Sequence, residues 1–247
     1  NEQDLKTMSE AVEVLRQFKG FSYFTEMSDI INRLEDHVAS ARMKTTPVID
    51  FEKNESLKGL DYLDTIYHAI VNEHPIQLKY RSFKARSANN FIFYPYLLKE
   101  YRNRWFVYGV RGNGRILQNL ALDRIQSLEV LPQEHYIKNT FFDPNTFFDD
   151  LVGVTKNSGS VAEKIGFKVA AAEAPYIITK PIHRSQQVVE RLADGSVILE
   201  IEVVINHELE RVFFRYAEGI QVLYPKTLVE LMGRKLKKAA EPVSYTH

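Results

Sequence analysis

Arginine and aromatic side chains that suit phosphate and base recognition gather in the middle of the chain. Residues 104–131 alone carry four arginines among aromatic neighbours. A guanidinium offers a planar fork to phosphate oxygens and stacks on flat rings, and tyrosine or tryptophan rings stack on bases. These residue types predict a site for an anionic, ring-bearing ligand. Its candidate residues are Tyr80, Arg81, Tyr94, Arg104, Trp105, Tyr108, Arg111, Arg115, Gln118 and Arg124.

Each candidate also has a structural interpretation, which the sequence leaves open. Arg124 follows Asp123 at the end of an expected strand, so it either braces the fold through a carboxylate or carbonyl, or binds the ligand. Trp105, Tyr80 and Tyr108 are core residues in one interpretation and stacking surfaces in the other. Several arginines flank expected turns, where a solvated side chain is the alternative to a ligand contact: Arg102, Arg104, Arg111 and Arg115.

The balanced overall charge hides a basic middle segment. Residues 1–75 carry a net charge of −6, residues 76–131 carry +7, and residues 132–247 carry −1. A local surplus of this kind indicates an anionic partner. The alternative is internal, with the basic segment docked on the acidic N-terminal part.

Enzyme and metal motifs are missing from the sequence. It has no P-loop, HExxH or GxSxG pattern, its seven histidines are scattered without metal-ligand spacing, and it has no cysteine. No apolar run is long enough to span a bilayer. We therefore expect a cytoplasmic, non-enzymatic protein without catalytic residues, cofactor, metal or membrane partner.

The N-terminal residues read as helices. Apolar residues recur at spacings of three and four over 4–19, 25–41 and roughly 60–73. In the third segment we expect four residues to face inward: Leu63, Ile66, Tyr67 and Ile70.

The pattern then changes to alternation, which is typical of strands. Strands are expected at 76–83, 90–101, 104–111, 115–124 and 125–131, with a glycine hairpin turn at 112–114. Five short strands without helices between them predict a small Sm/SH3-like β-barrel. An irregular connector follows, whose aromatic residues imply that its first half packs on something: Phe141, Phe142, Phe147 and Phe148.

The last part of the chain alternates strands and helices in the order βαββαβ, with a final helix, which predicts a ferredoxin-like fold. The expected fold class is thus α+β, with a helical bridge at 1–73, the barrel at 74–132, the connector at 133–160 and the ferredoxin-like extension at 161–247. Arg211 and Arg215 lie four apart in an expected helix of this extension. They are a solvated helix face, or a secondary contact to the ligand or to a partner subunit.

The basic segment resembles the WYL domain of bacterial transcription regulators, which is named for a Trp-Tyr-Leu run. That run is Trp105-Phe106-Val107 here, and "LALDRIQSLEVL" resembles the family's Leu-Asp-Arg-Ile ending at residues 122–125. "LKYRS" and "YPYLLKEYRNRWFVYG" are similar to the family's first strands. The resemblance continues into the C-terminal extension of such regulators through "FDPNTFFDDLVGV", "HRSQ", "DGSVILEIEV" and "IQVLYPKTLVE".

Residues 1–73 resemble the bridge that joins the WYL domain to a winged helix-turn-helix head, and we expect that head to be absent from this chain. The resemblance implies a ligand sensor for single-stranded nucleic acid or a nucleotide, and a homodimer, formed through the extension, whose DNA-binding heads contact operator DNA. A Gly/Ser-rich stretch at 157–160 is a candidate pivot. Gln118 stands where the family often has arginine, which weakens phosphate binding or changes the ligand.

The alternative function is a protein-interaction module whose basic face contacts an acidic partner. Pairing of the arginines with carboxylates of residues 1–75 would favour it.

Overall fold

The computed structural model describes residues 29–30, 32–33, 58–112, 116–216 and 218–241. The chain divides into two compact units, Asn1–Phe141 and Phe142–His247. The fold is α+β with antiparallel sheets, as the sequence predicts. The helix expected at 4–19 lies outside the described residues, and so does most of the helix expected at 25–41.

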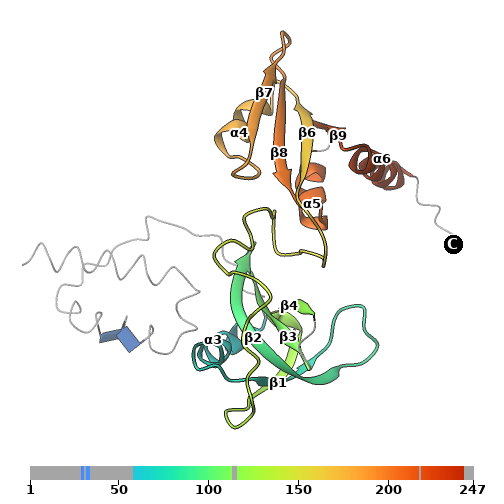
Figure 1. The fold of residues 1–247 in the computed structure, drawn as a ribbon. Helices are drawn as coiled ribbons and strands as arrows, with labels where there is room; N and C mark the ends of the chain where they lie inside the picture. The colour runs from blue at the N-terminus through green and yellow to red at the C-terminus, as the bar shows by residue number, and fades with distance from the viewer. Residues whose placement is uncertain (1–28, 31, 34–57, 113–115, 217, 242–247) are drawn as a thin grey trace, which may run out of the picture. The chain divides into compact units, whose positions relative to one another are not determined.

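The first unit contains a five-stranded antiparallel sheet in the order β4-β3-β2-β1-β5 (Figure 1). The strands are β1 (Ile76–Tyr80), β2 (Asn89–Tyr101), β3 (Arg104–Arg111), β4 (Leu117–Ala121) and β5 (Ile125–Val130). The expected barrel is not found closed in the described part of the chain, because β5 pairs with β1 and no pairing joins it to β4. Between β4 and β5 the chain makes one 3-10 turn, η4 (Leu122–Arg124).

One short helix covers the core of this sheet. η3 (Leu60–Tyr62) leads into α3 (Leu63–Val71), whose Leu63, Ile66 and Ala69 are buried at steps of three residues. The expectation that Tyr67 faces inward is wrong, because this residue is 45% exposed. The helix packs against β2, and the shared core also includes Ile76, Leu78, Phe93, Val107 and Leu122.

Gly59 fixes the approach of this helix to η4. It has a φ of +84°, and a Cβ atom there would lie 2.3 Å from the backbone carbonyl of Leu122. Only glycine combines this backbone conformation with so close an approach. The buried Leu122 side chain anchors the same turn. Arg124, which ends this turn, therefore follows a well-packed segment of backbone.

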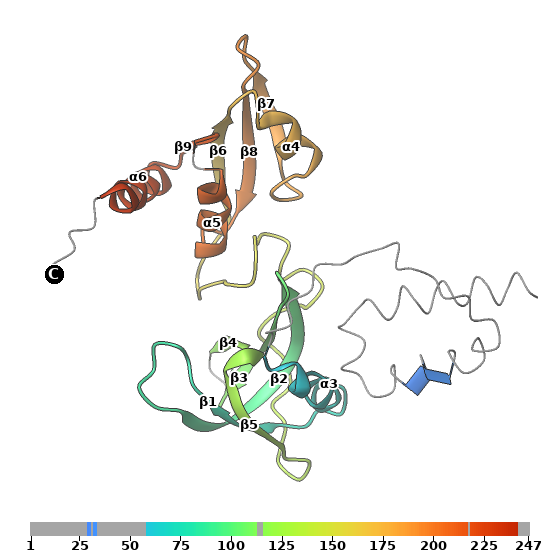
Figure 2. The same cartoon turned by 180° about the vertical axis from the view of Figure 1, so that it is seen from behind.

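The second unit contains a four-stranded antiparallel sheet in the order β7-β8-β6-β9 (Figure 2). Its elements are β6 (Glu163–Val169), α4 (Ala174–Thr179), β7 (Gln187–Arg191), β8 (Val197–Val203), α5 (His207–Arg215), β9 (Ile220–Tyr224) and α6 (Lys226–Ala240). The core joins buried residues of the sheet, among them Phe167 and Leu199, to buried residues of all three helices, among them Phe213 of α5. This order of elements is the expected one, and the ferredoxin-like assignment stays a prediction.

The connector is anchored in both units. Tyr136 donates a hydrogen bond to the carbonyl of Pro95, and Phe141 stacks on Tyr96 at 6.2 Å between ring centroids. In the second unit, Asn206 caps α5 and its Nδ2 donates to the carbonyls of Val152 and Thr155 at 3.0 and 2.9 Å. The first half of the connector therefore packs as its aromatic residues predict.

The helices within the described ranges include none that is both long and apolar enough to cross a membrane.

Candidate ligand-binding site

Arg124 lies where η4 ends beside the end of β1. The backbone N–H of Arg81 donates to the carbonyl of Arg124 at 3.1 Å, which joins the two segments. The Arg124 side chain is 26% exposed, and its Nε lies 3.7 Å from Oδ1 of Asp123. That separation makes an ion pair without a hydrogen bond. Among the described residues neither of these two buried atoms has a hydrogen-bond partner, a condition that is rare in folded proteins and concentrates at functional sites.

Asp123 also interacts with a second arginine. Nε of Arg104 lies 3.4 Å from Oδ2 of Asp123, whose side chain is only 11% exposed. One carboxylate thus faces two guanidinium groups, and the cluster of Arg104, Asp123 and Arg124 keeps a net positive charge. This surplus is available to an anion.

Tyr80 completes the surroundings of Arg124 at the end of β1. Burial raises the pKa of the Tyr80 hydroxyl, while the positive charge of Arg124 beside it acts in the opposite direction. The hydroxyl therefore stays protonated at neutral pH and serves as a neutral hydrogen-bonding group. Its half-buried ring packs against the core. Tyr80 is therefore partly the core residue of one interpretation, and its exposed part remains open to the ligand contact of the other.

Phe83 is the residue of this site that sequence reasoning missed. Its ring is 74% exposed, and Cζ of Arg124 lies 4.5 Å from the ring centroid. The available signal was an aromatic residue among cations in a short loop, with Arg81, Lys84 and Arg86 around it. Proximity to Arg124 was not visible in the sequence, because it depends on the pairing of β1 with β5.

The register places further candidates on the same face of the sheet as Tyr80. Leu78 pairs with Phe91, so Phe91 and Tyr80 are diagonal neighbours on that face. Cζ of Arg111 lies 4.0 Å from the centroid of the Phe91 ring. Gln118 pairs with Gly109 and shares the face with Arg111. Tyr80, Arg111 and Gln118 therefore lie along one face.

Tyr94 and Tyr108 lie on the opposite face of the sheet. Each is next in sequence to a residue of the Arg111 face, Phe93 and Gly109 respectively, and successive side chains of a strand point to opposite faces. Tyr94 packs edge-on against Tyr136, with 6.1 Å between ring centroids. Tyr108 is 2% exposed. Neither is placed beside Arg124. Trp105 is half-buried and packs against the core, as its structural interpretation predicts.

The remaining candidates are not brought to this site. Arg115 lies outside the described residues. Arg211 and Arg215 are exposed on α5 in the second unit, where Cζ of Arg215 lies 5.9 Å from the Tyr216 ring. The predicted site residues as a set stay a prediction.

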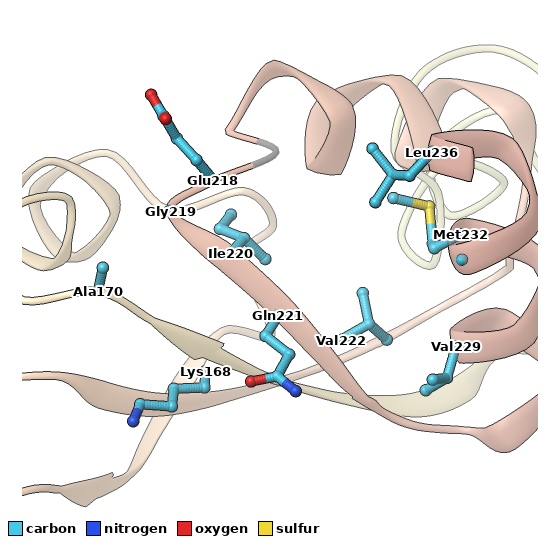
Figure 3. A pocket seen from close by; sticks show the side chains of 11 residues that line it. Lys168, Ala170, Glu218, Gly219, Ile220, Gln221, Val222, Val229, Met232 and Leu236 are labelled. Carbon is cyan, nitrogen blue, oxygen red and sulfur yellow. The ribbon is translucent and has the colours of Figure 1, made fainter. Parts of the chain in front are cut away.

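A groove of about 460 Å³ in the second unit lies between β9 and α6 (Figure 3). Val222, Val229, Met232 and Leu236 give it an apolar lining, and no arginine or aromatic residue contributes to it. The charged residues of its lining are Lys168 and Glu218, so the groove offers a phosphate-bearing ligand one cation together with one carboxylate, and no ring for a base. Within the part of the chain that the structure describes, no group of three His, Cys, Asp or Glu side chains is arranged to hold a metal ion.

Two domain families match the chain. Residues 61–130 match the WYL domain, and residues 162–240 match the WCX domain. No curated protein matches the chain.

Two solved structures resemble parts of it. Proteasome accessory factor B/C (PafBC) of Arthrobacter aurescens is 16% identical with a TM-score of 0.35, over 85% of this chain and 32% of that one. A CRISPR Cas-related protein is 12% identical with a TM-score of 0.44, over 74% of this chain and 51% of that one. The chain thus spans about a third of the length of the first and about half of the second.

Proposed function

The chain is a WYL-domain protein that also carries a WCX domain, and from this we propose that its first unit senses a nucleic-acid or nucleotide effector. Arg124 would bind a phosphate, and aromatic rings at the same end of the sheet would contact the base. The observation that carries this proposal is the arrangement around Arg124. Its guanidinium lies on the exposed ring of Phe83, beside the half-buried Tyr80, and next to a carboxylate shared with Arg104.

The charge of the site supports an anion over a cation. Two arginines face one carboxylate, and the exposed Arg111 adds a third guanidinium on the face that holds Tyr80. In the sequence, no Asp or Glu occurs between Tyr80 and Lys99. An anionic ligand therefore meets little repulsion along this part of the unit.

The proposal extends to regulation of transcription. Effector binding would change the placement of the first unit relative to the second in a homodimer, and thereby the spacing of attached DNA-binding heads. The second unit would supply the dimer contact. The protein would act in the cytoplasm, without catalysis of its own.

The protein-interaction alternative depends on where the arginines find their partners. Arg124 and, from the start of β3, Arg104 pair with Asp123 of η4, and not with a described residue of the acidic N-terminal part. One basic residue, Lys138, does pair with Glu73 at 2.9 Å. The local pairing of the two site arginines favours the effector proposal.

The test is binding of fluorescently labelled single-stranded DNA and RNA of about ten nucleotides, followed by anisotropy at about 50 and 200 mM salt. We expect salt-sensitive binding that Arg124→Ala reduces at least tenfold. Arg191→Ala is the matched control, because it removes an exposed arginine from β7 in the other unit. Equal loss in both variants, or no binding to any oligonucleotide or nucleotide, contradicts the proposal.

A further inference from the structure

The β1–β2 loop presents an aromatic ring to solvent next to the site arginine. Figures 1 and 2 show this connection as an open loop at one end of the sheet. Phe83 in this loop is 74% exposed. A single exposed apolar side chain is common on protein surfaces and by itself indicates nothing. The position of Phe83, 4.5 Å from Cζ of Arg124, is what distinguishes it.

The loop itself is held in a definite conformation. The N–H of Ala85 donates to the carbonyl of Ser82 at 3.0 Å, and Nε of Arg81 reaches the carbonyl of Ala85 at 3.5 Å. These contacts tie the two ends of the turn that carries Phe83. The backbone that carries the ring is therefore held before any ligand arrives, which lowers the entropy cost of stacking on the ring.

Two further cationic residues lie close to Phe83 in the sequence of the loop. Lys84 and Arg86 follow Phe83 in the loop, and both are exposed. Neither forms an ion pair with a described residue, whereas Arg104 and Arg124 share Asp123. An exposed ring close in sequence to exposed cations combines a surface for a base with contacts for the flanking phosphates, which is the arrangement that single-stranded nucleic acids use.

We propose that Phe83 is the stacking platform for an unpaired nucleobase and that the Phe83–Arg124 pair makes the site require a base in addition to phosphate. This inference rests on the proposed effector site and deepens it, because it separates base-bearing ligands from simple polyanions. One face of the Phe83 ring lies on Arg124, and the high exposure of the ring leaves room for a base. Lys84 and Arg86 hold the phosphates on either side of that base.

The test compares a base-bearing probe with one that lacks bases. A labelled single-stranded oligonucleotide and an abasic oligonucleotide of the same length carry the same phosphates. For Phe83→Ala we expect a loss of roughly 5- to 100-fold in affinity for the base-bearing probe, the range of one stacked base. The affinity for the abasic probe stays unchanged, and so does the salt dependence, since no charge is removed.

Three further variants make the result specific. Phe83→Trp keeps a stacking ring and retains the affinity, while Phe83→Leu keeps apolar bulk without a ring and loses it. Tyr176→Ala is the matched control, because Tyr176 is an exposed aromatic residue on α4, 69% exposed, in the other unit. It leaves binding unchanged. Circular dichroism confirms that the variants are folded, as the exposure of both rings leads us to expect.

The outcomes separate this inference from the proposed function. Binding of the wild type that Arg124→Ala abolishes and Phe83→Ala leaves intact overturns the inference alone. An equal loss for the abasic probe in Phe83→Ala also overturns it, because the ring would then support phosphate contacts only. A wild type that binds no oligonucleotide or nucleotide overturns both. A nucleoside triphosphate used as competitor distinguishes the two sources of the base: displacement at low concentration indicates a nucleotide, and its failure indicates a strand.

Discussion

At the scale of single residues, Asp123 controls how much positive charge the site offers. It lies 3.4 Å from Arg104 and 3.7 Å from Arg124, and no second carboxylate of the described residues pairs with either arginine. A ligand phosphate must therefore compete with this internal anion. The carboxylate keeps both guanidinium groups in place and weakens their attraction for other anions.

We predict that Asp123→Asn binds single-stranded DNA about fivefold more tightly, since it removes a charge that contributes on the order of 1 kcal/mol to each partly exposed pair. Anisotropy at low salt measures the change. Glu202→Gln, an exposed carboxylate of β8 in the other unit, is the matched control. Weaker binding by Asp123→Asn would mean that the carboxylate orients the arginines more than it neutralises them.

His183 gives the second unit a stability that depends on pH. Its pKa is lowered, mainly by burial and also by the charge of Arg184. Nδ1 accepts a hydrogen bond from the N–H of Ser185 at 3.2 Å, which a protonated ring cannot do. The folded protein thus favours the neutral ring, and this stabilisation is complete above the ordinary histidine pKa of about 6.5 and is lost as the pH falls below it.

We therefore predict a lower urea midpoint for the wild type at about pH 5.5 than at about pH 7.5. His183→Gln, which cannot titrate, should show a smaller difference between the two conditions. His135→Gln, a histidine of the other unit, is the control and should behave as the wild type does. An identical pH dependence of the urea midpoint in wild type and His183→Gln would mean that His183 is not the source of the pH-dependent stability.

At the scale of elements, close packing against Gly109 fixes how β3 crosses β2. A Cβ atom at this residue would lie 2.1 Å from the carbonyl oxygen of Tyr94 and 2.6 Å from the Phe93 ring. Backbone contacts of this kind cannot be relieved by rotating a side chain. The face that carries Arg111 and Gln118 depends on this register.

We predict that Gly109→Ala destabilises the first unit by about 1–3 kcal/mol, the usual cost of overpacking. Gly233→Ala is the contrasting variant, because a Cβ atom there meets nothing within 4 Å and the residue lies inside α6. It should stabilise the second unit by about 0.5–1 kcal/mol. Urea unfolding followed by circular dichroism measures both. A Gly109→Ala variant that is more stable than the wild type, together with a Gly233→Ala variant that is less stable, would refute the packing account of Gly109.

The elements were more predictable than their assembly. Alternation located β1, β2, β3 and β5 within a few residues, because each strand buries one face along its own sequence. Barrel closure depends on pairing between distant strands, which no local pattern records. The irregularity between Pro95 and Leu97 and the packing of Tyr136 decide the environment of Tyr94, and Phe83 meets Arg124 only through the fold. The residue types of the candidate site were therefore visible in the sequence, whereas the grouping of Phe83 with Arg124 was not, and the predicted site itself stays a prediction.

At the scale of the whole molecule, the two units have separate cores. One core gathers residues of α3 and the five-stranded sheet, and the other gathers residues of the four-stranded sheet and its helices. We predict that the fragment from Phe142 onward folds cooperatively by itself. The single tryptophan of the chain, Trp105, lies in the first unit. Its fluorescence in the intact protein should therefore report unfolding of that unit, and a fragment that stays unfolded would refute the division.

The central claim is that Arg124 holds a phosphate, and the slope of binding affinity against salt tests it most directly. For single strands, each phosphate contact contributes about 0.7 to the magnitude of the slope of log affinity against log salt concentration. We predict that Arg124→Ala lowers the slope by about one contact relative to the wild type, while Arg191→Ala leaves it unchanged. Parallel lines for wild type and Arg124→Ala would mean that the guanidinium braces η4 and that no phosphate lies against it.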